Sequence, residues 1–160
     1  MPIVNADVKN LEGCVFADLS NDAAMIKEIT DYTYDRSLPD LHTNNQTDFS
    51  LPSRLVSKRF LFKLVYGATA YGFYTDPDFL FMGYSEEQWE DVIQAFYKKY
   101  SGGAKWHKSI VAEAQKNGRL TIPSGRYFPF YPSKNSRGEL KWPITQIKNY
   151  PVNLCSGLVE

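Results

Sequence analysis

The sequence predicts an α+β fold in which helices dominate, and three features point to that class. A segment beginning at Ser85 combines a capping box, Ser-Glu-Glu-Gln, with an amphipathic pattern. The run 54–66 contains no Gly or Pro and stops at Gly67, as helices commonly do. Strand patterns occur at residues 2–7 and again at 119–130. With 160 residues, 43% of them apolar, the chain is long enough for one domain with a buried core.

The first thirty residues are predicted to hold one strand and two helices. Residues 2–7 form a short, mostly apolar strand that ends at Asp7. A helix follows from Leu11 to Leu19, where apolar side chains recur at helical spacing. A second short helix starts after Asn21 and continues through Ile29.

The middle of the chain is predicted to hold one regular helix between two irregular segments. Residues 31–48 are polar and contain a proline, which favours a loop with one helical turn near Leu41. Ser53 then caps a helix from Arg54 to Tyr66. Residues 67–83 are rich in Gly, Tyr and Phe and are expected to be a connecting segment.

The last third is predicted to contain two helices and a hairpin. The helix that begins at Ser85 stops at Ser-Gly-Gly, residues 101–103, and a second helix extends from about Ala104 to Asn117. Residues 119–130 form a hairpin that turns at Pro-Ser-Gly. The tail from Tyr131 is a loop, with helical character near 144–148.

The net charge of zero is a cancellation of charged blocks. Residues 1–50 carry nine acids and three bases, and residues 51–75 carry four bases and no acid. Residues 76–100 carry six acids and two bases, whereas residues 101–160 carry nine bases and three acids. The balance excludes a uniformly basic protein, but a metal site in the acidic start and phosphate sites in the basic blocks remain open.

The cysteine content and the hydropathy indicate in which cellular compartment the protein is expected. Two cysteines, Cys14 and Cys155, are typical of a reducing environment rather than of a disulfide framework, so a cytoplasmic protein is expected. Charged residues interrupt the N-terminus, and the longest uncharged stretch, residues 64–75, is too short to cross a bilayer. The sequence therefore predicts no membrane association.

Four side chains of the 54–66 helix form one stripe. Arg54, Lys58, Phe62 and Tyr66 recur every fourth residue, so they drift only about 40° per step over about 18 Å. Two cations, a ring and a phenol follow the chemical order of a triphosphate, a sugar and a base. The same spacing is also common on solvated basic faces and in aromatic cores, so the stripe alone leaves both interpretations open.

The stripe resembles the fingers helix of family A DNA polymerases, the family of bacterial DNA polymerase I and many phage replicative enzymes. Residues 54–67 match the family motif R-x3-K-x3-F-x3-Y-G at every defined position. Asp7-Val-Lys-Asn-Leu-Glu12 is similar to the family's motif A, approximately D-Y-S-Q-I-E. These two motifs occur in the order that the family shows.

Three further segments extend the resemblance to residues 2–152. Asp40-Leu-His42 resembles the D-I-H that follows motif A. Gly125-Arg126 resembles the G-R of the fingers-to-palm hairpin, and residues 148–152 resemble the N-x-P-x-Q segment that contacts primer-template. The resemblance implies a palm segment at 1–50, fingers helices at 51–118, and a hairpin returning to the palm at 119–160. In that arrangement the first strand is an edge strand of the palm.

The resemblance implies nucleotidyl transfer from a dNTP to a primer 3′-hydroxyl by two Mg²⁺ ions. Asp7 would bridge the metals with help from the carbonyl of Val8. Arg54 and Lys58 would neutralise the outer and inner phosphates, and Lys58 would act in catalysis by stabilising charge on the leaving group. Phe62 would stack on the sugar.

The remaining site residues follow from the same resemblance. Glu12 would exclude ribonucleotides by filling the space of a 2′-hydroxyl, and Tyr66 would pack near the templating position. Arg126, Lys148 and Asn149 would contact DNA. The implied partners are dNTP and primer-template DNA, and the implied setting is the cytoplasm of a bacterial cell or a phage-infected host.

The chain departs from the family pattern near its end. Asn153 stands where a Gln is expected, and the following residues do not follow the family. Motif C, a His-Asp-Glu hairpin that supplies the second metal aspartate, is absent, because neither His42 nor His107 is followed by Asp-Glu. We therefore expect a fragment that cannot polymerise DNA alone and needs the missing polymerase segments as partners.

Alternatives to a catalytic part remain open. The chain could be a non-catalytic module that keeps dNTP and DNA contacts through Arg54, Lys58, Arg126 and Lys148, or a helical domain whose basic stripe is solvated. On sequence alone, Asp7 could instead cap the first helix, and Glu12 could be an ordinary surface residue.

Overall fold

The computed structural model describes residues 10–156 of the chain. The predicted strand at 2–7, together with Asp7 and Val8, lies outside the described residues. The described part is mostly helical, with two short antiparallel strand pairs. The expected α+β class with dominant helices is confirmed.

The first three helices are α1 (Leu11–Ser20), α2 (Ala23–Tyr34) and α3 (Leu41–Asp48). The first two were predicted, but the loop expected at 31–48 is wrong, because α2 continues through Tyr34 and α3 has eight residues. The Asp40 side chain caps α3 by accepting a hydrogen bond from the backbone N–H of Thr43 at 2.9 Å. Leu41 is buried, so packing extends the single helical turn predicted near Leu41 into a helix of eight residues.

The predicted central helix is α4 (Arg54–Val65). The Ser53 hydroxyl accepts a hydrogen bond from the Val56 N–H at 3.2 Å, and Gly67 follows the helix with a φ of 88°. Positive φ favours glycine, which explains the sharp end of the helix. One face of α4 is buried in the core, and the other carries the Arg54 to Tyr66 stripe.

The segment 67–83, predicted to be a connector, contains helix α5 (Ala70–Tyr74) and the 3₁₀ helix η1 (Leu80–Met82). Thr69 caps α5 by accepting from the Gly72 N–H at 3.2 Å. Phe73 and Phe79 are buried, at 0% and 1% exposure. These aromatic anchors order a segment whose composition predicts only turns.

Helices α6 (Glu86–Lys99) and α7 (Ser101–Asn117) are separated in the sequence by a single residue, Tyr100. The predicted capping box of α6 is present. The helix α7 starts three residues earlier than expected, so Gly102 and Gly103 lie in its first turn. A carboxylate oxygen of Asp22 accepts their N–H groups at 2.7 and 3.2 Å, and a Cβ on Gly103 would meet the Phe16 ring at 2.7 Å. A distant contact therefore overrides the local tendency of Gly-Gly to break a helix.

The C-terminal part contains two hairpins and a helix. The predicted hairpin is β1 (Arg119–Thr121) paired with β2 (Tyr127–Pro129), with Leu120 opposite Phe128. The tail is not the expected loop: β3 (Ser133–Lys134) pairs with β4 (Leu140–Lys141), and α8 (Ile144–Ser156) has thirteen residues. Burial of Ile147 and Val152 stabilises α8 beyond the few residues predicted.

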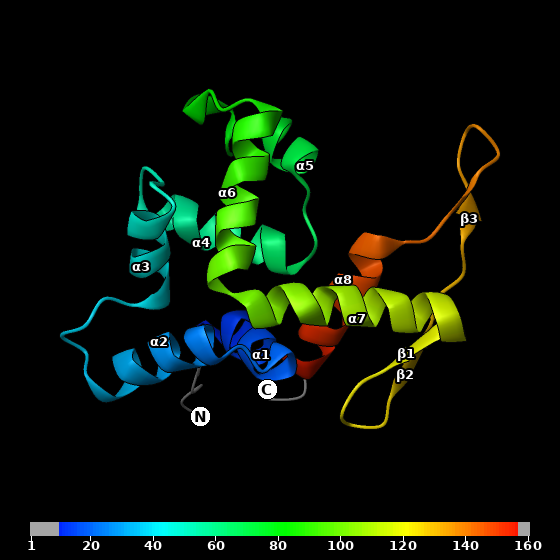
Figure 1. The fold of residues 1–160 in the computed structure, drawn as a ribbon, viewed down its shortest axis with the longest axis horizontal. Coiled ribbons are helices and arrows are strands. Elements are labelled where there is room, and N and C mark those ends of the chain that lie inside the picture. The colour runs from blue at the N-terminus through cyan, green and yellow to red at the C-terminus, as the bar shows by residue number, and fades with distance from the viewer. Residues whose placement is uncertain (1–9, 157–160) are drawn as a thin grey trace, which may run out of the picture.

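Two groups of buried side chains hold these elements together. The larger is aromatic and joins α1, α4, α5 and α6, with Trp89 stacked on Phe73 at 4.9 Å between ring centroids. The smaller joins α7, the first hairpin and α8 around Ile110, Leu120 and Ile147. Figure 1 shows α7 running across the molecule, with α3 to α6 on one side of it and the first hairpin near its end.

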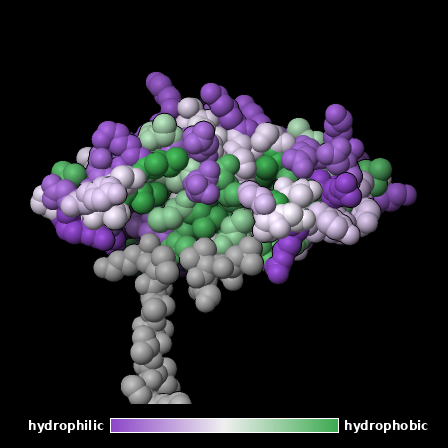
Figure 2. Space-filling view, turned by 90° about the horizontal axis from the view of Figure 1, so that it is seen from below, coloured by the Kyte–Doolittle hydropathy of each residue, from purple (hydrophilic) through white to green (hydrophobic). Residues whose placement is uncertain are grey.

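One face of the molecule is notably apolar at its centre. Figure 2, a view from below, shows hydrophobic residues gathered in the middle of this face and hydrophilic residues toward both ends. None of the described helices is long and apolar enough to span a membrane.

Candidate functional site

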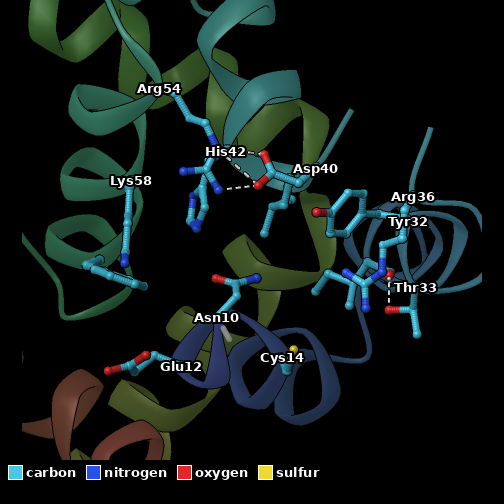
Figure 3. Close-up of a pocket in the computed structure, with 13 residues that line it drawn as sticks. Asn10, Glu12, Cys14, Tyr32, Thr33, Arg36, Asp40, His42, Arg54 and Lys58 are labelled. Carbon is cyan, nitrogen blue, oxygen red and sulfur yellow. Dashed lines mark hydrogen bonds and ion pairs between the residues drawn. The ribbon is translucent and has the colours of Figure 1, made fainter. Parts of the chain in front are cut away.

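A cavity of about 620 Å³ opens beside the α4 stripe. Figure 3 shows its walls, which come from the start of α1, the end of α2, the start of α3 and one face of α4. From the stripe, Arg54, Lys58 and Phe62 line it, whereas Tyr66 does not. The other lining residues are Asn10, Glu12, Cys14, Ile29, Tyr32, Thr33, Arg36, Asp40, Leu41 and His42. We call this space the stripe cavity.

Arg54 is held by an acidic partner on the wall of the stripe cavity. Its Nε donates to the two carboxylate oxygens of Asp40 at 3.2 and 3.1 Å, and a terminal nitrogen forms an ion pair with the same carboxylate. Partial burial alone would raise the pKa of Asp40, but hydrogen bonds from Arg54 and Thr43 and the charge of Arg54 hold that pKa far below its usual range. The carboxylate therefore stays ionised and orients the guanidinium.

Lys58, Phe62 and His42 form the next part of the wall. The Lys58 ammonium lies 5.4 Å from the centroid of the Phe62 ring, whose neighbour at 5.9 Å is the His42 ring in an edge-on arrangement. Burial, together with the charges of Arg54 and Lys58, lowers the pKa of His42 to about 4, although Asp40 opposes this. The imidazole is neutral at pH 7, and its buried Nδ1 has no hydrogen-bond partner among the described residues.

The wall opposite α4 comes from α1 and α2. Glu12 lines the stripe cavity from α1. Burial and the negative charge of Glu12 both raise the pKa of the Tyr66 phenol. The Arg36 guanidinium carbon lies 4.6 Å from the centroid of the Tyr32 ring, which is close enough for a cation–π contact. Burial raises the pKa of the Cys14 thiol, so Cys14 faces the cavity protonated.

The predicted DNA-contacting residues lie away from the stripe cavity. Lys148 and Asn149 are on α8, where the Asn149 side chain accepts a hydrogen bond from Asn153. Arg126 is exposed at the turn of the first hairpin, and its carbonyl accepts from Ile122 at 2.9 Å. None of the three lines the cavity.

Residues 10–156 contain no cluster of three His, Cys, Asp or Glu side chains that could hold a metal ion. The predicted ligands Asp7 and Val8 lie outside that range. The described part therefore supplies cations and a neutral imidazole to the stripe cavity, but no metal centre of its own.

The sequence predicted four residues that line the stripe cavity, namely Arg54, Lys58, Phe62 and Glu12. It assigned no role to four of their neighbours in the cavity wall. Asp40 and His42 appeared only as part of a resemblance, although an aspartate directly before Leu41 could have signalled a helix cap. Tyr32 and Arg36, spaced i, i+4, carried no pattern that distinguishes them from a solvated face.

The arrangement suits an elongated polyanion. A row of cations on one helix, backed by an aromatic ring and faced by a carboxylate, can bind phosphates at one end and an apolar ring at the other. Any such ligand competes with Asp40 for Arg54.

The fold and the site define a mostly helical α+β protein with a phosphate-compatible cavity, and comparison assigns the family. The chain belongs to DNA polymerase family A, whose family model matches residues 1–148. A search of curated proteins found no match.

A solved structure has a similar fold. It is the POL domain of Pol1 from M. smegmatis in complex with DNA primer-template and dNTP. The match has a TM-score of 0.68 and 22% sequence identity, and it covers 92% of this chain and 25% of the other. The present chain thus spans about a quarter of the length of that chain.

Proposed function

We propose that the chain is the nucleotide-binding part of a family A DNA polymerase, acting in template-directed DNA synthesis during replication. The observation that carries the proposal is the meeting of Arg54, Lys58 and Phe62 with Glu12 in one cavity. These residues come from two helices separated in sequence, and each suits a different part of a dNTP. Family membership supports the same assignment.

In the proposed complex, Arg54 and Lys58 bind the outer and inner phosphates. Charge-assisted hydrogen bonds from both side chains stabilise the charge that builds on the leaving pyrophosphate. Phe62 packs on the sugar, and Glu12 occupies the volume that a 2′-hydroxyl would need. Tyr66, at the end of the stripe, lies toward the templating base.

Magnesium enters the proposal through Asp7 and Val8, which the family resemblance matches to metal ligands. When bound, Mg²⁺ supplies charge neutralisation and lowers the pKa of a coordinated hydroxyl. The acidic side chains that line the stripe cavity, Glu12 and Asp40, form no metal cluster with other described residues. We propose that a second carboxylate comes from another polymerase segment, because no His-Asp-Glu occurs in the 160 residues.

DNA is the second proposed ligand. Primer-template would contact Arg126, Lys148 and Asn149, which follow the fingers helices in sequence.

The alternative is a module that binds dNTP and DNA without catalysis, and complementation with the missing palm segment decides between the two. Incorporation that depends on Asp7 supports the catalytic role, and binding without incorporation under complementation supports the module.

Direct titration with a dNTP tests the binding site. We expect Arg54→Ala and Lys58→Ala each to weaken binding about tenfold or more, since a hydrogen bond to a charged group contributes about 1.5–3 kcal/mol. Arg59→Ala is the matched control, because Arg59 lies on the same helix and pairs with Asp78 at 3.4 Å. If all three variants bind the dNTP as tightly as the unmodified chain does, the stripe is a solvated face and not a binding site.

A further inference from the structure

A second cavity, of about 650 Å³, lies between α6, α7 and the start of α8. In Figure 1 the first turn of α8 lies on the side of α7 from which α6 rises. Three lysines from three different helices, Lys98, Lys108 and Lys148, line this space. None of the described residues that line it is acidic. We call it the lysine cavity.

The three lysines have no acidic partners within residues 10–156. Lys98, Lys108 and Lys148 form no ion pair with any described residue. Lys148 is also partly buried, and its side chain packs so closely on Gly67 that a Cβ there would meet Lys148 Cδ at 2.8 Å. A partly buried ammonium without a carboxylate loses hydration and gains no compensating charge. An anionic ligand would supply that charge.

The floor of the lysine cavity is neutral. The Tyr97 hydroxyl lies 2.9 Å from His107 Nδ1, and His107 Nε2 lies 3.2 Å from the Val65 carbonyl oxygen. Since a carbonyl only accepts, Nε2 carries the proton and Nδ1 accepts from the tyrosine. Burial lowers the pKa of His107 to about 3, so the floor adds no charge and the three lysines set the sign of the cavity.

The position of the lysine cavity relates it to the α4 stripe. His107 binds the carbonyl of Val65 and Lys148 packs on Gly67, so the cavity begins where α4 ends. This step rests on the proposed function, in which phosphates lie at Arg54 and the base lies toward Tyr66. The template base that pairs with the incoming nucleotide then lies at the same end of α4, and unpaired template nucleotides leave from there.

We propose that the lysine cavity binds the phosphate backbone of the unpaired template strand. Lysines contributed by separate helices suit successive phosphates, and the apolar side chains of Val111 and Ile144, which also line the cavity, suit sugars and bases. The proposal makes Lys98 and Lys108 DNA-binding residues, which the sequence motifs do not single out, and gives Lys148 a defined partner.

Titration of the full chain with a fluorescent oligonucleotide, (dT)8, tests the proposal. We expect the double variant Lys98→Ala/Lys108→Ala to bind (dT)8 about tenfold more weakly. The slope of log affinity against log salt should fall by about 1.4, because each phosphate contact on a single strand contributes about 0.7. The control is Lys105→Ala/Lys116→Ala, which removes two lysines of the same helix α7 that do not line the cavity.

Several outcomes would overturn the proposal. Absence of (dT)8 binding by the unmodified chain, equal losses in both double variants, or no loss in either would remove the site. Tighter binding of an eight-base-pair duplex would contradict an unpaired strand, and pyrophosphate binding as tight as that of (dT)8 would indicate a small-anion site. A parallel dNTP titration, which the lysine variants should leave unchanged, reports on the proposed function separately.

Discussion

The two cavities beside α4 both present cations, but they treat those cations differently. In the stripe cavity Arg54 is paired with Asp40, and His42 is buried with an unpartnered Nδ1. In the lysine cavity the three lysines form no ion pair with any residue that the structure describes, whereas the buried His107 has hydrogen bonds at both ring nitrogens. In the stripe cavity the Asp40 carboxylate orients Arg54, and an anionic ligand must replace it. In the lysine cavity Tyr97 and His107 form a neutral floor, and the positive charge of the lysines is left for a ligand to neutralise.

The largest expected effect is a loss of stability on replacing the buried His107, which should exceed the loss on replacing the buried His42. His107→Ala leaves the Tyr97 hydroxyl and the Val65 carbonyl without partners and opens space beside Phe16, so we expect the free energy of unfolding to fall by about 3–5 kcal/mol. His42→Ala should lower it by only about 2 kcal/mol, because Nδ1 of His42 has no partner to lose. Urea unfolding measures both, and equal losses would contradict the contrast.

Acid titration sharpens the same contrast. Both histidines have folded-state pKa values, about 4 for His42 and about 3 for His107, below the usual 6.5. The unfolded chain therefore binds more protons below pH 6.5, and stability falls as pH decreases from 6.5 toward 4, by up to about 1.4 kcal/mol per pH unit for each histidine. Unfolding at a series of pH values measures this slope. His107→Gln should remove about half of it, and an unchanged slope would show that His107 does not titrate on unfolding.

A smaller effect is expected at the Asp40–Arg54 pair. Asp40→Asn keeps a residue suited to capping α3 but frees Arg54 from its anion. Such partly exposed pairs contribute about 0.2–1 kcal/mol, so inorganic tripolyphosphate should bind up to about fivefold more tightly. Calorimetric titration measures the change, and weaker binding would mean that orienting Arg54 matters more than the competition.

An effect of similarly small size is expected at Lys148. Lys148→Met keeps an unbranched apolar stem against Gly67 and removes a partly buried charge, so we expect the free energy of unfolding to rise by about 0.5–1 kcal/mol. Thermal unfolding of the ligand-free chain measures this gain. A loss of stability would show that the Lys148 ammonium has a partner that compensates for its burial.

Local signals explain what the sequence could predict. The start of α6 was predictable because Ser85 and Gln88 complete a capping box within four residues, and α4 was predictable from its cap and from Gly67. The four-residue spacing of the stripe fixed which of its side chains share one face. That part of the site therefore followed from the geometry of a single helix.

Long-range contacts explain what the sequence could not predict. Helices α3 and α5 form because Leu41 and Phe73 are buried against other elements, which a polar or glycine-rich segment does not reveal. The Asp40–Arg54 pair joins residues fourteen apart, and the lysine cavity brings together one lysine from each of three helices. The residue pattern within a single segment cannot predict contacts between residues that lie far apart in the sequence.

The carboxylate of Asp22 has a consequence for how the molecule opens. It caps α2 by accepting from the Met25 N–H at 3.0 Å, and it also accepts the N–H groups of Gly102 and Gly103 at the start of α7. The positive ends of two helix dipoles therefore share one anion across eighty residues of chain. The starts of α2 and α7 should fray together, and their amide protons should exchange with solvent as one cooperative unit.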